Sequence, residues 1–124
     1  MLRAIWLALA VAGCAVAPPD DPRVNAEAVE PLVCTSRAQC DIYWQRAQVW
    51  VANNSEYRIR VATDVLIETF GPFGSKVDLA YRITRLPDNS GGARIYIVAA
   101  CDNFIRCYPP RTDAIIAFKR FVRQ

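Results

Sequence analysis

Five cysteines and the absence of histidine define the chemistry that this sequence can do. Cys34 and Cys40 are six residues apart, as are Cys101 and Cys107, which leaves Cys14 as an odd thiol. The 124 residues include no histidine. Ser-His-Asp triads, Cys-His dyads and the usual mixed zinc ligand sets are therefore excluded, and we expect no catalytic residue and no metal site.

Paired carboxylates are the main remaining route to catalysis, and Asp64 with Glu68 is the pair to consider because both are expected on one side of a strand. Four residues of strand cover about 13 Å, whereas glycosidase carboxylates lie roughly 5–9.5 Å apart. The chain also lacks a glycine-rich phosphate loop followed by Lys-Ser or Lys-Thr. We therefore expect neither an enzyme nor a small-molecule cofactor.

The odd cysteine stands at the end of an export signal. Met1-Leu2-Arg3 is a short positive stretch, and Ala4 to Ala12 is an apolar run too short to cross a bilayer. Val11-Ala12-Gly13-Cys14 resembles a lipobox, the processing signal of bacterial lipoproteins. The resemblance implies that residues 1–13 are a signal peptide and that Cys14 becomes the fatty-acylated, palmitate-bearing first residue of the mature protein.

The same resemblance implies a location. Several acyl chains together hold a protein firmly on a membrane. Ala15 after the cysteine, in place of an aspartate, implies an outer-membrane lipoprotein that faces the periplasm. The alternative is a soluble secreted or periplasmic protein cut at Ala15-Val16-Ala17, which fits the small-residue rule but discards Cys14.

Residues 14–31 have the composition of a tether. They carry four prolines and four acidic residues, and no apolar side chain larger than valine. Such a segment is expected to be coil or polyproline-like chain. A single domain is then expected over residues 32–124.

A helix is predicted to begin at Ser36, because Ser36-Arg37-Ala38-Gln39 matches a capping box. Apolar residues recur behind it at steps of three and four on one face, and Asn53-Asn54 provides a stop. The aromatic residues of this stripe are interpreted as core.

The rest of the chain predicts three strands and a closing helix. Apolar and polar residues alternate over 58–68, with a kink near Thr63, then over 77–84 and over 94–101, with turn residues between them. Residues 112–122 return to a helical period. We expect a two-layer α+β domain of order α-β-β-β-α, with a three-stranded antiparallel meander and both helices on one face.

The four cysteines of this domain are expected to form disulfides in an oxidising compartment. We favour Cys34–Cys40 and Cys101–Cys107, although the sequence leaves the two other connectivities open. The first bond would fasten the incoming chain to the helix, and the second would close a loop after the third strand. Both are interpreted as structural.

Two features are candidate binding surfaces. The sheet face opposite the helices is expected to carry a basic and aromatic set interspersed with the acids Asp64, Glu68 and Asp78. The basic and aromatic set is Arg58, Arg60, Arg82, Arg94 and Tyr96. The second candidate is the disulfide-closed loop with Asp102, Asn103 and Phe104, where Phe104 either points outward for recognition or folds inward onto the core.

These observations favour a non-enzymatic envelope lipoprotein that acts as a binding or assembly module. Its expected partners are the membrane, through the lipid anchor, and an envelope protein or anionic envelope polymer. The net charge of +3 is small and diffuse, so nucleic acid is not expected as a partner. The alternative function is a periplasmic inhibitor or immunity protein directed against a hydrolase or toxin.

Overall fold

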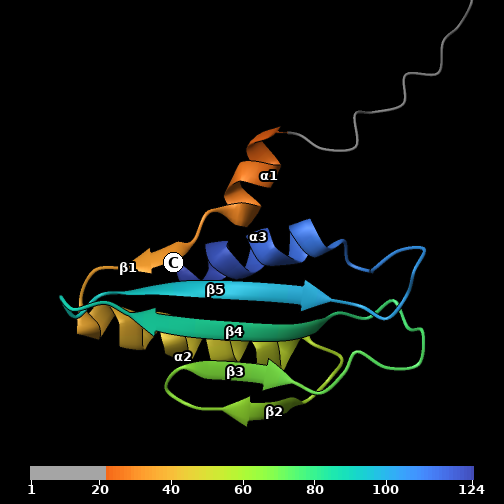
Figure 1. The fold of residues 1–124 in the computed structure, drawn as a ribbon, viewed down its shortest axis with the longest axis horizontal. Coiled ribbons are helices and arrows are strands. Elements are labelled where there is room, and N and C mark those ends of the chain that lie inside the picture. The colour runs from red at the N-terminus through yellow and green to blue at the C-terminus, as the bar shows by residue number, and fades with distance from the viewer. Residues whose placement is uncertain (1–21) are drawn as a thin grey trace, which may run out of the picture.

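The computed structural model describes residues 22–124 and shows an α+β fold (Figure 1). These residues form three helices and one antiparallel sheet of five strands, so the α+β class is confirmed and the three-stranded meander is wrong. Cys14 and the predicted signal peptide lie outside the described residues. The elements are α1 (Pro22–Val29), β1 (Leu32–Cys34), α2 (Arg37–Asn54), β2 (Ile59–Ala62), β3 (Leu66–Thr69), β4 (Ala80–Pro87), β5 (Ala93–Ala100) and α3 (Arg111–Val122).

The predicted first strand is two strands joined by a tight turn. The Thr63 hydroxyl accepts the backbone N–H groups of Val65 at 3.3 Å and Leu66 at 3.0 Å, and the Thr63 N–H donates to the Leu66 carbonyl. A threonine side chain that bonds nearby backbone in this way competes with a continuous strand. The alternating pattern in the sequence therefore continues across a turn. The kink expected near Thr63 is the turn of a β2–β3 hairpin.

The other additional strand is β1, which pairs with β5 at the far edge of the sheet from β2. Leu32 lies opposite Ile95 and Cys34 opposite Ala93, with both β1 side chains buried. Three residues are too few to show a strand period in the sequence. The strand is fastened by the disulfide from Cys34 to Cys40 at the start of α2.

The predicted helix after Ser36 is confirmed as α2. The Ser36 hydroxyl accepts the Gln39 N–H, and the Gln39 side chain in turn accepts the Thr35 N–H, which satisfies two otherwise free donors. Its apolar face is buried, and the Trp50 ring meets the rings of Tyr81 on β4 and Phe118 on α3 edge to face. The core therefore lies between the sheet and the pair α2 and α3, which lie on the same side of it (Figure 1).

Helix α1 falls within the expected tether. It packs on α3 beside the sheet, where the buried Lys119 ammonium donates to the carbonyl groups of Glu27, Ala28 and Glu30 at the end of α1 (Figure 1). The last carbonyl groups of a helix lack partners within it, so an ammonium group placed there acts as a cap. This part of the expected linker is thus a docked helix, and the folded part of the chain includes residues 22–31.

Candidate functional site

The face of the sheet opposite α2 and α3 is left uncovered by the described helices. Strand pairing arranges the larger side chains of this open face in three cross-strand rows. The rows are Val33–Arg94–Leu86, Tyr96–Thr84–Leu66 and Val98–Arg82–Glu68, and the bulge in β2 sets Arg60 and Val61 beside Glu68. Residues far apart in the chain therefore form one continuous surface.

The open face has more positive than negative charge. Arg60, Arg82 and Arg94 lie on it, and the exposed Arg58 lies at its edge just before β2. The acid on these rows is Glu68, whose side chain is 19% exposed and forms ion pairs with Arg60 and, at 3.4 Å, with Arg82. The prediction that Asp64 and Asp78 also lie on this face is wrong, because Asp64 lies in the β2–β3 turn and Asp78 lies before β4.

Large apolar side chains are also exposed on this face. The surface predicted from the sequence included its charged residues and Tyr96 but not the aliphatic ones. Tyr96, placed here as expected, is 41% exposed. Val33, Leu86 and Val98 are 50%, 56% and 59% exposed. The open face therefore presents arginines among apolar contacts, a composition typical of protein interfaces.

Asp64 and Glu68 lie in different parts of the structure. The predicted separation of these two carboxylates requires one straight strand, whereas residues 59–69 form a hairpin. Glu68 lies on the open face, and Asp64 lines a cleft beside α2.

The loop after β5 points its apolar residues outward. Phe104 is 98% exposed and Ile105 is 76% exposed, so the inward alternative for Phe104 is wrong. The Cys101–Cys107 disulfide closes the loop, and with Cys34–Cys40 it confirms the favoured pairing. The apolar tip is thus presented on a closed frame.

Asp102 and Asn103 hold this loop in place. The Asn103 side-chain oxygen accepts the N–H groups of Ile105 and Arg106, each at 3.0 Å, and its amide donates to the Ser75 carbonyl at 2.9 Å. The Asp102 carboxylate accepts the Ser75 N–H at 3.0 Å. Both residues are therefore positioning residues, and the exposed contact surface belongs to Phe104 and Ile105.

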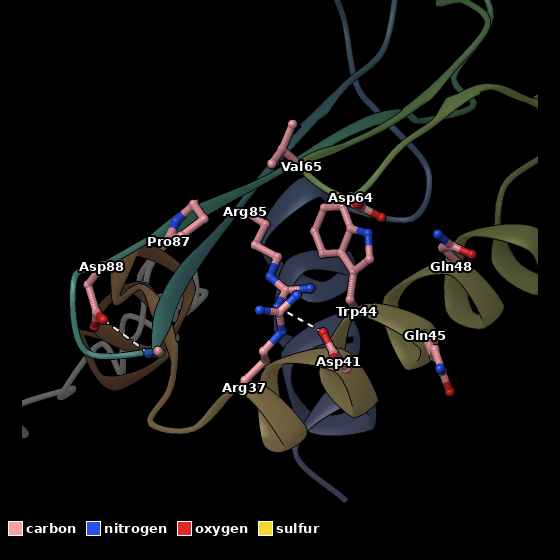
Figure 2. A pocket seen from close by; sticks show the side chains of 12 residues that line it. Arg37, Asp41, Trp44, Gln45, Gln48, Asp64, Val65, Arg85, Pro87 and Asp88 are labelled. Atoms are coloured by element: carbon pink, nitrogen blue, oxygen red, sulfur yellow. Dashed lines mark hydrogen bonds and ion pairs between the residues drawn. The ribbon is translucent and has the colours of Figure 1, made fainter.

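A cleft that sequence reasoning missed lies between the first half of α2 and the ends of the β2–β3 and β4–β5 hairpins (Figure 2). Its volume is about 690 Å³. The Trp44 indole N–H donates to the Thr63 carbonyl at 2.9 Å, which ties the β2–β3 turn to α2. Arg85 on β4 forms an ion pair with Asp41 on α2 at 3.0 Å.

The sequence feature that could have indicated this cleft is a charged residue at a strand position that faces the helices. Tyr81 and Ile83 point into the core, and the same alternation places Arg85 on the helix side of β4, where its side chain is 14% exposed. Its partner Asp41 is 44 residues away in the chain, so only the packing of α2 on the sheet reveals the pair.

Comparison of the chain with protein-family models, with curated proteins and with solved structures finds no match in any of the three. Among residues 22–124, none of the helices combines the length and the apolar character needed to cross a membrane.

Proposed function

We propose that this protein is a non-enzymatic binding module of the bacterial envelope, held at the outer membrane through acylated Cys14 and docking an acidic partner protein on its open face. The observation that carries the docking proposal is the uncovered set of arginines beside Tyr96, Val98 and Leu86. The anchor is supported by the lipobox-like Val11-Ala12-Gly13-Cys14.

Charge and apolar exposure together favour an acidic protein over the other occupants of this face. A second copy would bring two net positive faces together, and like charges disfavour such pairing. An anionic polymer would match the charge but leave the exposed valine and leucine side chains without apolar contacts. An acidic protein can match the positive charge and also supply apolar contacts. Arginine and tyrosine are, in addition, residue types that often contribute most of the binding energy of an interface.

The docking proposal is tested by recovering the tagged full chain from detergent-solubilised envelopes of its native host. We expect a resident partner with an acidic contact surface, whose binding to the purified protein weakens as salt is raised. Arg94→Glu should weaken that binding at least about tenfold, because it sets like charges against each other. Arg94 has no ion-pair partner among the described residues, so this change leaves the fold intact.

Lys76→Glu is the matched control. It changes the net charge equally, and Lys76 is exposed in the loop between β3 and β4. Equal effects of the two substitutions, or a partner with a basic contact surface, would refute docking on the open face.

The anchor is tested separately by the intact mass of the protein recovered from its host. We expect a chain that begins at Cys14 and carries fatty acids. A chain that begins elsewhere, or one without acyl groups, would refute the anchor and leave the docking proposal standing.

The loop at Phe104 favours a second candidate function, that of a periplasmic inhibitor. A rigid, closed loop with an exposed aromatic side chain loses little conformational entropy when it enters a pocket of another protein. If the recovered partner is a hydrolase or toxin, the purified protein should block its activity, and Phe104→Ala should relieve the block while Arg94→Glu does not. If the Phe104→Ala variant still blocks the activity of the hydrolase or toxin, this role for the loop is refuted.

A further inference from the structure

We infer that the cleft beside α2 binds a small zwitterionic ligand, with its carboxylate against Arg37 and Arg85 and its ammonium group toward Asp64. This site involves the helix side of the sheet and the adjoining turns. It is independent of the open face and of the lipid anchor.

The carboxylate end is built from two guanidinium groups on different elements. Figure 2 shows Arg37 from the first turn of α2 and Arg85 from β4 pointing toward one another across the cleft. Asp41 meets Arg85 through one nitrogen, and its own side chain is 54% exposed. Asp41 therefore occupies only part of the Arg85 guanidinium group and leaves room for a second carboxylate.

The remaining donors of these arginines face the cleft. A guanidinium group carries five N–H donors. Among the described residues, the guanidinium of Arg85 has one hydrogen-bond partner, Asp41, and that of Arg37 has none. Guanidinium groups bind carboxylates through paired, charge-assisted hydrogen bonds, so these free donors match a ligand carboxylate.

The position of Arg37 also favours an anion. A cation in the first turn of a helix is opposed by the helix dipole, so Arg37 contributes nothing to α2 by its charge. The Ser36 and Gln39 side chains already cap this end of the helix. An anion bound beside Arg37 would be stabilised by both the guanidinium group and the dipole.

The other end of the cleft is acidic. Asp64, in the β2–β3 turn, lies beside Trp44 and away from Arg37 (Figure 2). It forms no ion pair within residues 22–124. Asp88 also lines the cleft, but it lies beside Pro87 and away from Asp64 (Figure 2), and its Oδ1 accepts the Ser90 N–H and hydroxyl and the Gly92 N–H in its own turn. Asp64, which has no ion pair among the described residues, is therefore the carboxylate that this end of the cleft offers to a ligand cation.

The space between the two ends suits a small molecule. Ligand pockets usually enclose roughly 300–1,000 Å³, and the cleft falls within this range. Trp44, Val65 and Pro87 supply apolar lining along it. A ligand with an apolar body between a carboxylate and an ammonium group would meet each part of this lining.

The test is a titration of the full chain in detergent with δ-aminovalerate as the zwitterionic probe, followed by amide and indole NMR. We expect saturable shifts at Trp44 and Gln45. Valerate lacks the cation and pentylamine lacks the carboxylate. Valerate should bind about two- to fivefold more weakly than δ-aminovalerate, the range of an exposed ion pair, and pentylamine about tenfold more weakly or not at all.

Two variants assign the ends of the ligand. Arg37→Gln should weaken δ-aminovalerate binding about tenfold, the loss expected for a charge-assisted hydrogen bond. Asp64→Asn should make δ-aminovalerate and valerate bind equally, because the ammonium group then has no partner. Both residues are exposed, so the variants fold, and Arg94→Gln on the open face is the matched control that should leave the affinity unchanged.

Three results would overturn the inference. The first is the absence of saturable binding by δ-aminovalerate. The second is an equal effect of Arg37→Gln and Arg94→Gln. The third is a preference for δ-aminovalerate over valerate that survives in Asp64→Asn, since the cation would then be recognised elsewhere.

Discussion

Replacement of Lys119 by methionine should release α1 from the rest of the protein. Lys119 is 2% exposed, and its ammonium donates to the carbonyl groups of Glu27 at 3.0 Å and Ala28 at 2.7 Å as well as to that of Glu30. Methionine preserves most of the apolar volume of the lysine stem while removing all three hydrogen bonds. The variant therefore isolates the cap from the packing of α3.

The size of the effect follows from the groups involved. Hydrogen bonds to a charged group contribute about 1.5–3 kcal/mol each, but a buried ammonium also loses its hydration. This loss is evident in the pKa of Lys119, which burial lowers, with the charge of Arg123 adding to the effect and those of Glu30 and Glu27 opposing it. Once α1 leaves, water solvates its carbonyl groups, which limits the total. We expect a loss of about 2–3 kcal/mol from the free energy of unfolding.

The loss should be local as well as global. Helix α1 has eight residues, and an isolated helix of this length is unstable in water. Hydrogen exchange should therefore show loss of protection in α1, including the Glu30 N–H that donates to the Ala26 carbonyl, while α2 remains protected. Urea unfolding of the full chain in detergent measures the change in the free energy of unfolding of the whole domain.

Arg120→Met is the matched control. Arg120 also contacts α1, through two 2.9 Å bonds to the Glu27 carboxylate, but its side chain is 69% exposed. Exposed ion pairs contribute little, so this variant should keep α1 protected. If Lys119→Met also keeps α1 protected, or if Arg120→Met destabilises it equally, the buried cap is not what holds the helix.

Two further predictions concern the core and the loop. Burial raises the pKa of Tyr81 from 10.0 to about 12, so the unfolded chain loses this proton first and stability should fall as pH rises from about 10 to about 12. Tyr81→Phe should remove that part of the alkaline decline in urea-unfolding measurements, and an unchanged decline would contradict the assignment to Tyr81. Replacing Cys101 and Cys107 together by alanine should lower the free energy of unfolding by about 2 kcal/mol, from the entropy of closing a loop of this length. Hydrogen exchange at Ile105 should accelerate in that variant, and a loop that stays fully protected would show that Asn103 alone holds it.

Local patterns in the sequence were sufficient for part of the fold. The Ser36–Gln39 capping box and the apolar stripe behind it predicted α2, because both signals depend on residues within a few turns of each other. Alternation predicted β4 and β5 and placed Arg82, Arg94 and Tyr96 on the face away from the helices. The favoured disulfide pairing is confirmed, and each bond joins cysteines only six residues apart.

The tertiary structure decided the features that depend on distant partners. Lys119 looks in sequence like a cation near the end of a helix, and only the docking of α1 makes it a buried cap. The partner of Arg85, Asp41, is brought near by the packing of α2 on the sheet.

The helices and strands could be predicted more completely than the surfaces that they form. Periodicity reports which side of a strand or helix a residue occupies, whereas burial and pairing depend on what the rest of the chain places beside it. The sequence by itself therefore determined the main helices and the faces of β4 and β5, and it favoured the disulfide pairing that the structure shows. Long-range packing determined the place of β1 at the sheet edge, the outward direction of Phe104 and the cleft beside α2.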